Sequence, residues 1–330
     1  MAQALLKKGL KNFKTVPILI IVRIFLAVGL SPFTQLKSEL KEANMAVVNT
    51  NVGASVAQAA LAKNARELNT AMTQLSTGQR INSAGDDASG LAITNRMTSQ
   101  INGLGAAIQN ANDAISMIST AEGALDEVTD MLQRMRELAV QAGTGSMTSD
   151  DRTYLNNEFA ALRSEIDRIA DNTEWNGNTI LDGSAGGTGA SSVTFQVGVD
   201  GGQTIAVNFG NMTNTSGGDM AVIASDVISG ATAASGQSNA TTAISNLDTA
   251  IGNVSTQRSA FGAGSNRMEH AVDNLTNVKT NAEASRSRIL DTDYAKSTSE
   301  LARTQIIQQA GTAMLAQANQ LPQTVLALLQ

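Results

Sequence analysis

The sequence predicts a mainly α fold, in which N- and C-terminal helices form a long antiparallel coiled-coil rod and a small central insertion contains a β-hairpin. Apolar residues recur at alternating spacings of three and four near both ends, which is typical of coiled-coil seams. Aromatic residues are only 3% of the 330 residues, so aliphatic side chains must fill the core. Pro322 is the one proline after residue 44, which suits long unbroken helices.

The N-terminal seam begins in a helix expected over about 48–80, where Leu61, Leu68 and Leu75 lie one heptad apart. A longer helix follows and ends at Gly143-Thr144-Gly145, and a shorter one is expected over about 150–171. The seam of the long helix shows a phase slip near Glu122. Its residues are Ile101, Leu104, Ile108, Ala111, Ile115 and Ile118, then Leu125, Val128, Leu132, Met135 and Ala139.

The C-terminal third repeats this pattern. Its seam residues are Met268, Ala271, Leu275, Val278, Ala282, Ser285 and Ile289. After a break at 290–293, a last helix is expected over about 294–319. Its buried side should be Ala302, Ile306, Ala310, Ala313 and Gln317. The apolar end, 321–330, requires a partner that covers it.

The middle of the chain is rich in Gly, Ser, Thr, Asn and Ala. Alternating apolar residues in 193–199 and 205–209, on either side of Asp200-Gly201-Gly202-Gln203, predict a β-hairpin. The stretch 211–240 has weak periodicity and few charges, so we expect a small, exposed, variable region. The matching seams at the two ends should pack together, with the middle as an outward excursion.

The first 44 residues differ from the rest. They carry seven Lys/Arg and two Glu, a net charge of +5, whereas 45–330 carry 16 Lys/Arg and 27 Asp/Glu, a net charge of −11. A basic start before the apolar run 16–30 is the layout of a signal peptide, but Arg23 interrupts that run and no Ala-x-Ala cleavage site follows. A misassigned start, with Met45 as the true one, is the favoured interpretation. A working signal or anchor, or an ordered part of the fold, stays open.

Composition excludes several kinds of site. The chain has no Cys and one His, His270, so disulfides, thiolate nucleophiles and Cys/His zinc sites are ruled out. We expect no catalytic, metal or cofactor site and no enzymatic activity. Asp86 and Asp87 suit a helix N-terminus better than a metal, and the glycine-rich stretches lack the strand-then-helix context of a phosphate loop. The net charge of −6 disfavours nucleic acid as a partner.

Several segments resemble bacterial flagellins. They are the start Met45-Ala46-Val47-Val48-Asn49-Thr50-Asn51, the stretch from Leu75 to Ile93 that includes Ser76-Thr77-Gly78-Gln79-Arg80-Ile81-Asn82, the motif Thr173-Glu174-Trp175-Asn176-Gly177, and the end Ala310-Gly311-Thr312-Ala313-Met314-Leu315-Ala316-Gln317. The resemblance covers 45–181 and about 245–330, in the order and spacing of the family. Residues 1–44 have no counterpart in it.

The resemblance implies a structural subunit that polymerises into the extracellular flagellar filament and gives swimming motility. It divides the chain into 1–44 as an extension, 45–85 and 290–330 as parts of an inner-tube domain, 86–181 and 245–289 as parts of a helical rod domain, and 182–244 as a variable outward region. Secretion by the flagellar type III apparatus, an export chaperone, and cap and hook-junction proteins are implied as well. The expected polymerisation tail consists of Leu321, Val325, Leu326, Leu328 and Leu329.

A second implied surface lies on the long helix. The stretch 132–142 is similar to the part of flagellins that Toll-like receptor five, a host innate receptor, recognises. By that likeness Arg134, Leu138, Gln141 and Glu158 would contact the receptor. We expect their main role to be packing against neighbouring subunits, so the receptor could reach them on the free monomer alone.

Two alternative functions stay open. A hook–filament junction protein would share the terminal helices of the family, although Glu174-Trp175-Asn176-Gly177 and the Gln-rich tail are more typical of flagellins. A membrane-tethered surface adhesin would use 16–30 as its anchor. Ser and Thr residues in 184–242 could carry O-linked glycans if this region faces outward.

Overall fold

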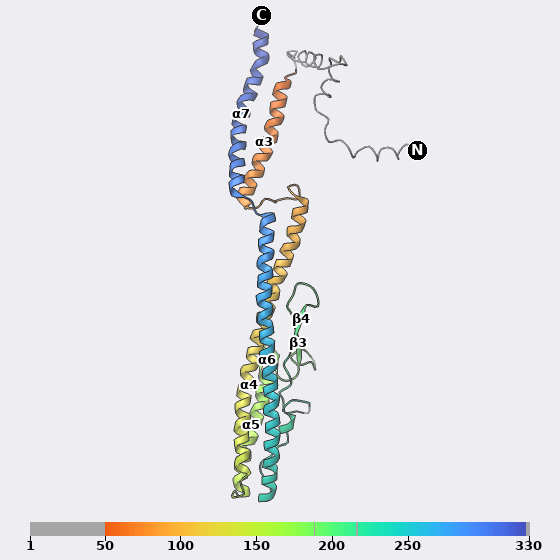
Figure 1. Cartoon of the computed structure of the whole chain (residues 1–330), viewed down its shortest axis with the longest axis vertical. Coiled ribbons are helices and arrows are strands. Elements are labelled where there is room, and N and C mark those ends of the chain that lie inside the picture. Colours follow the sequence, from red (N-terminus) through yellow and green to blue (C-terminus); the bar gives the residue numbers. More distant parts are fainter. Residues whose placement is uncertain (1–49, 188, 216, 328–330) are drawn as a thin grey trace, which may run out of the picture. The chain divides into compact units, whose positions relative to one another are not determined.

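The computed structural model describes residues 50–187, 189–215 and 217–327, with side chains up to Gln320 (Figure 1). It confirms a mainly α fold with small antiparallel strand pairs in the centre. The chain forms two compact units: unit 1 runs up to Thr73 and resumes at Tyr294, and unit 2 is Gln74–Asp293. The predicted extension 1–44 lies outside the described residues.

Unit 2 is built on two long helices, α4 (Ala88–Ala142) and α6 (Ala233–Leu290), with α5 (Ser149–Asn172) beside them (Figure 1). The predicted phase slip near Glu122 is wrong, because the buried residues of α4 alternate by three and four without a break from Leu104 to Ala142. Small residues at Ala107, Ala114 and Ala121 continue the seam where Ile108 and Ile115 were expected, and those isoleucines are half-buried beside it. On α6, Met268 and Leu275 are buried as predicted, whereas Val278 is 40% exposed.

Polar contacts between α4 and α6 show that the two helices run antiparallel in one register. Arg286 donates to Thr98 (3.3 Å), Arg258 pairs with Asp126 (3.0 Å), and Arg136 pairs with Asp248 (2.7 Å). Each of these pairs is at least partly exposed, so their individual contribution to stability is small. The apolar seam between them supplies most of the stabilisation.

The start of α4 is fixed by Asp87. Its carboxylate accepts a hydrogen bond from the Gly90 N–H (2.8 Å), which makes Asp87 the N-cap, and that hydrogen bond lowers its pKa. A Cβ on Gly90 would lie 2.4 Å from the Asp87 carboxylate and 2.6 Å from Ile81, so a side chain there would displace the capping carboxylate. The prediction that the aspartates mark a helix N-terminus is therefore confirmed.

The loop before α4 is joined to the end of α6. Gln79 and Asp291 form an antiparallel bridge, in which Arg80 N–H donates to Leu290 O (2.6 Å) and Thr292 N–H donates to Gly78 O (3.0 Å). This pairing places 74–85 with unit 2, so the boundary of the unit differs from the domain end predicted at residue 85.

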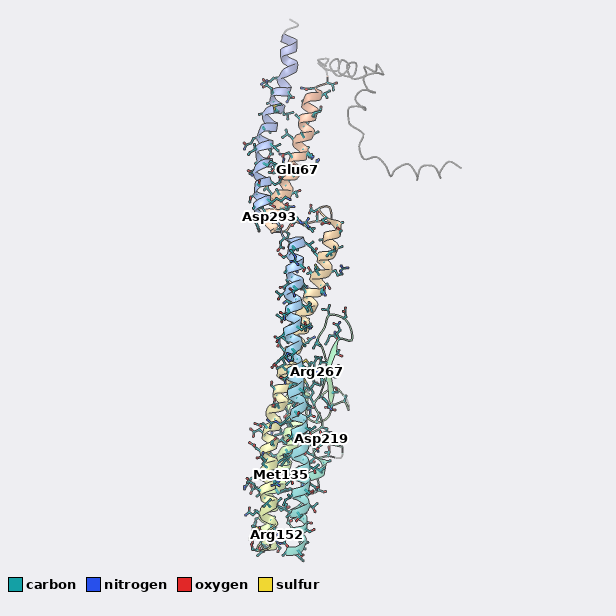
Figure 2. The ribbon with its side chains drawn as sticks, in the orientation of Figure 1. Glu67, Met135, Arg152, Asp219, Arg267 and Asp293 are labelled. Carbon is teal, nitrogen blue, oxygen red and sulfur yellow. The ribbon has the colours of Figure 1, made fainter. Side chains whose placement is uncertain are left out.

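The turn between α4 and α5 is organised by a fully buried arginine, Arg152, which lies at the tip of the helices in Figure 2. Its guanidinium donates to three backbone carbonyls at the end of α4, those of Ala142 (2.8 Å), Thr144 (2.8 Å) and Met147 (3.0 Å). A cation at a helix C-terminus also complements the helix dipole. The side chain packs on Gly236 of α6, where an added Cβ would lie 2.7 Å from Arg152 Cδ.

The predicted hairpin is confirmed as β3 (Ser192–Gln196) and β4 (Thr204–Asn208), which pair antiparallel with Thr194 opposite Ala206. A smaller hairpin, β1 (Glu174–Trp175) and β2 (Asn178–Thr179), turns through Asn176 and Gly177, both at positive φ. Phe209 follows β4 and packs on Phe261 of α6, with ring centroids 5.3 Å apart. This contact fixes the hairpin to the helices.

The stretch 211–240 is more ordered than its sequence predicted. Its apolar residues Met212, Met220, Ile223 and Ile228 are fully buried, and η1 (Ala221–Ile223) is a short 3₁₀ turn. Helix α6 then begins at Ala233, inside the range expected to be loop. Its start is fixed by Thr232 and Ser235, which form a capping box. Apolar periodicity did not predict this order, because four separate buried side chains can hold an irregular stretch without any regular spacing.

Asp226 is the buried carboxylate of this stretch. It is 9% exposed, its Oδ1 accepts from Asn246 Nδ2 (2.8 Å), and its Oδ2 accepts no hydrogen bond from the described residues. Burial raises the pKa of Asp226 above its ordinary value of 3.8, against the opposing effects of Asn246 and Arg163. The folded protein therefore binds this proton more tightly than the unfolded chain does.

We predict that Arg152→Ala lowers the free energy of unfolding of unit 2 by about 3 kcal/mol, because three carbonyls lose a charged donor. Denaturant unfolding monitored by circular dichroism measures this. The control is Arg168→Ala, whose arginine is exposed and pairs with Glu165, and which should cost less than about 1 kcal/mol. Equal effects of the two substitutions would contradict the capping role.

We predict that Asp226 favours folding at low pH. Its contribution is fully present below pH 3.8, the ordinary value, and is lost as the pH rises through the raised pKa of the folded state. The difference in unfolding free energy between the parent and Asp226→Asn should therefore fall from pH 3 to pH 8. Unfolding titrations of both proteins across this range test it, and a constant difference would show that the carboxyl is not perturbed.

Candidate assembly surfaces

In unit 1, α3 (Val52–Thr77) and α7 (Tyr294–Ala327) lie side by side and antiparallel (Figure 1). Their buried side chains among the described residues of this unit are Asn64, Ala71, Ser297 and Thr304. Asn64 Nδ2 donates to the Thr304 carbonyl (2.8 Å), and Asn64 Oδ1 accepts no hydrogen bond from described residues. The fully buried positions of this pair are thus small or polar, in contrast with the large apolar residues buried in unit 2.

Two further contacts set how closely the helices approach. Leu61 and Leu68 lie half-buried in the seam, as their heptad spacing predicted. Leu61 sits over Gly311, where a Cβ would be 2.7 Å from Leu61 Cδ2. Glycine at this position therefore permits the close approach that brings Asn64 within reach of a backbone carbonyl on α7.

The edges of the pair carry exposed polar contacts. Arg303 Nη2 lies 3.2 Å from Glu67 and also pairs with Glu300, and Asn51 Nδ2 donates to the Ala318 carbonyl (2.7 Å). The hydrogen bond from Arg303 lowers the pKa of Glu300. Arg303 and Glu67 are each more than a third exposed, so their pairing is screened by water and salt.

Large apolar side chains of the pair point outward instead. Ile306 and Met314 are 66% and 65% exposed on α7, and Val56 is 63% exposed on α3. Val52, Met72 and Ile307 are also exposed. These six residues lie on more than one side of the two helices, and we call them together the outer apolar face of unit 1. Burying a side chain of this size is worth roughly 1.5–3 kcal/mol, so this face provides a driving force for association.

The buried side predicted for α7 is wrong. Ala302, Ile306, Ala310, Ala313 and Gln317 are all exposed. The residues that face α3 are a different set, spaced seven residues apart: Ser297, Thr304, Gly311 and Ala318. The prediction followed Ile306 as an apolar residue, whereas this helix turns its larger apolar residues outward. The heptad of Ser, Thr, Gly and Ala was the signal that could have located the seam.

The predicted polymerisation tail is only partly within the structure. Leu328 and Leu329 lie outside the described residues. Leu321, Val325 and Leu326 belong to α7, but their side chains lie outside what is described. The tail therefore stays a prediction.

On unit 2, the structure brings together two of the residues predicted to form the receptor-like surface. Arg134 Nη2 lies 2.9 Å from Glu158 Oε1, and Arg134 Nη1 lies 3.0 Å from Glu137 Oε2. Hydrogen bonding with Glu137, and then with Glu158, raises the pKa of Arg134. Arg134, Glu158 and Gln141 are exposed, so all three are available to a partner.

Leu138 is a correction to that surface. It is 1% exposed and belongs to the core of unit 2, so its side chain cannot contact a partner. Val140, two residues on, is 51% exposed instead. An open hollow of about 560 Å³ lies beside it, lined by Gln133, Arg136, Glu137, Val140, Gln141 and Thr144. The exposure of Val140 could not be predicted from periodicity, because Val140 is an apolar residue among the apolar residues of the seam.

His270 is exposed on α6. Within the described ranges, no three His, Cys, Asp or Glu side chains gather as they would around a metal ion. The helices of the described part also lack a stretch long and apolar enough to cross a bilayer.

Comparison with known proteins follows the same division of the chain. The bacterial flagellin N-terminal helical region matches residues 48–186, and the bacterial flagellin C-terminal helical region matches residues 244–329. Flagellin of Halalkalibacterium halodurans is 44% identical over 284 residues, which are 86% of this chain and 100% of that protein. Flagellin A of Vibrio cholerae is 35% identical over 380 aligned positions, covering 86% and 99% of the two chains.

Among solved structures, a putative flagellar hook-associated protein from Vibrio parahaemolyticus has a TM-score of 0.50 at 18% identity, covering 62% of this chain and all of that one. This likeness concerns the fold alone. Bacillus cereus flagellin is 30% identical, with a TM-score of 0.42, over 54% of this chain and 94% of that chain. Together with the outer apolar face, the family matches at both ends of the sequence lead to one conclusion: the chain belongs to the bacterial flagellin family and is a structural subunit of the flagellar filament.

Proposed function

We propose that the filament assembles by burying the outer apolar face of unit 1 against neighbouring copies of the chain. The observation that carries this proposal is the reversed polarity of the α3–α7 pair, which has Asn64 and Thr304 inside and Ile306 and Met314 outside. Such a face is unfavourable in water. Contacts between different surfaces of successive copies do not close, and therefore propagate as a helix.

We assign 45–85 and 290–330 to the inner tube of the filament, 86–181 and 245–289 to the surrounding helical rods, and 182–244 to the outer surface. The two family regions support the central part of this assignment, because they end at residue 186 and resume at residue 244, whereas residues 74–85 belong to unit 2 of the structure. The tail residues Leu321, Val325, Leu326, Leu328 and Leu329 would join the inner-tube contacts. Their apolar character in the sequence supports that role.

The polar seam also bears on secretion. A pair without large buried apolar residues is marginal by itself, since packing of an apolar face supplies most of the stability of helices. The terminal helices would therefore be partly unfolded before assembly, which suits export through a narrow type III channel to the extracellular filament. An export chaperone would cover them beforehand, and cap and hook-junction proteins would receive them.

Filament assembly should depend on the outer apolar face. The double substitution Ile306→Ser and Met314→Ser removes about 3 kcal/mol or more of burial per copy, so the critical concentration for seeded polymerisation should rise at least about tenfold. Sedimentation of polymer at several monomer concentrations measures this.

The matched control is Val227→Ser. Val227 is 43% exposed but lies in the segment assigned to the outer surface. The critical concentration of this variant should therefore equal that of the parent. A double variant that polymerises like the parent would refute the role of this face. A chain that ends at Gln320 tests the polymerisation tail in the same assay. Normal filaments from this chain would refute the role of the tail in assembly.

The free monomer is also proposed as a ligand of Toll-like receptor five through Arg134, Gln141 and Glu158. Exposure of all three supports this. In the filament these residues would pack against neighbours, so the receptor would bind monomer alone. The junction-protein alternative is less supported, because its structural likeness is limited to the fold.

Arg134→Ala should reduce receptor signalling by purified monomer about tenfold or more, because arginines are frequent anchors at interfaces. A reporter-cell dose response measures the effect. Arg168→Ala is the control, since Arg168 is also exposed and paired with a glutamate three residues away. Unchanged signalling by a correctly folded Arg134→Ala monomer would exclude this surface.

A further inference from the structure

All the sulfur of this chain is in methionine, because the sequence has 12 Met and no Cys. An oxidant that reacts at sulfur therefore reacts with thioethers alone, and no thiol competes for it. Among the described residues, the methionines divide by unit. Those of unit 2 are buried or half-buried, whereas the two described in unit 1, Met72 and Met314, are 53% and 65% exposed.

The buried methionines of unit 2 fill its core. Met135 on α4 and Met268 on α6 are fully buried there, and so are Met212 and Met220 in the stretch after β4. A dissolved oxidant must reach the sulfur atom to react with it, so enclosure in the core protects these side chains. They therefore provide an internal control for any reaction at the two exposed methionines.

The exposed methionines belong to the outer apolar face of unit 1. Met314 lies one heptad after Ile307 on α7, so these two side chains are on the same side of that helix. Met72 lies near the end of α3. A thioether is apolar and accepts hydrogen bonds only weakly, so both side chains suit burial against another apolar surface.

Oxidation would reverse this character. The sulfur lone pair attacks one oxygen of hydrogen peroxide, the O–O bond breaks, and an S–O bond forms. The sulfur loses two electrons, and the departing hydroxide takes the remaining proton and leaves as water. The product, methionine sulfoxide, is a polar side chain. Burying its oxygen without a hydrogen-bond donor is unfavourable.

We propose that Met72 and Met314 are reversible oxidation sites of the free chain, and that their conversion to sulfoxide blocks filament growth until the sulfoxide is reduced. The oxidant class is a two-electron oxygen donor such as hydrogen peroxide. This inference rests on the proposed burial of the outer apolar face during assembly. Under that assembly both sulfur atoms are enclosed in the filament, so the modification acts on subunits that are not yet incorporated.

Treatment of purified full-length monomer with hydrogen peroxide, followed by peptide mass spectrometry, tests the sites. Met72 and Met314 should be oxidised at least about tenfold faster than Met135 and Met268, because only the first two are exposed. The critical concentration for seeded polymerisation of the oxidised monomer should rise at least about tenfold. Incubation with a methionine sulfoxide reductase should restore the value of the untreated parent.

The matched variant is Met72→Leu with Met314→Leu, because leucine has no sulfur and keeps an apolar side chain of similar volume. It should polymerise like the parent before treatment. After treatment, its critical concentration should stay within about twofold of the untreated value. The proposal is overturned if the parent polymerises normally with sulfoxide at both positions. It is also overturned if peroxide impairs the leucine variant as much as the parent.

These outcomes differ from a failure of the proposed function. If Ile306→Ser with Met314→Ser leaves polymerisation unchanged, the outer apolar face has no role in assembly. If that double substitution impairs polymerisation but sulfoxide at Met72 and Met314 does not, the role of the face is supported and the oxidation sites are refuted.

Discussion

The close, uninterrupted seam between α4 and α6 is the constraint on which unit 2 depends. Alanines at 107, 114 and 121 and Gly264 on the facing helix leave little side-chain volume between the helix axes. An added Cβ at Gly264 would come into ordinary van der Waals contact with Ile118, 3.5 Å from its Cδ1. Small residues at such regular intervals leave one register in which large and small side chains alternate. The polar pairs from Thr98–Arg286 to Arg136–Asp248 then follow from that register.

Several parts of unit 2 outside the seam are positioned by side chains of α5 and α6. Arg152 joins the end of α4 to the start of α5 through backbone carbonyls, and Phe261 provides the surface for Phe209. The stretch after β4 has backbone hydrogen bonds of its own, and side chains of α6 add to them: Asn253 Nδ2 donates to the Asp219 carbonyl. The long helices thus hold in place the stretch of unit 2 that has little secondary structure.

Much of the fold could be predicted from the sequence, since long helices, their ends and the hairpin follow from apolar periodicity and glycine-rich turns. The misses at the two helix seams share one cause. Ala107 and Ala114 in α4, and Thr304 and Gly311 in α7, lie at the seams, but the prediction gave weight to the nearest isoleucine instead. Leu138 was placed on the surface by resemblance and is buried. The backbone contacts of α5 and α6 could not be predicted, because an asparagine on a helix gives no sign of its partner.

The two units distribute polarity in opposite ways, and this difference has an energetic consequence. Unit 2 buries its large apolar residues in its own core, so most of its stabilisation comes from contacts within the unit. Unit 1 buries Asn64 and Thr304 while Ile306 and Met314 stay in water. A buried asparagine in a helical seam lowers stability but restricts how the helices can pair. A weak internal seam and a strong outer face mean that the free energy of ordering the terminal helices must come from contact with other copies. Under the proposed assembly, folding of unit 1 and growth of the filament would be one coupled step, with the hydrophobic contribution realised at the growing end.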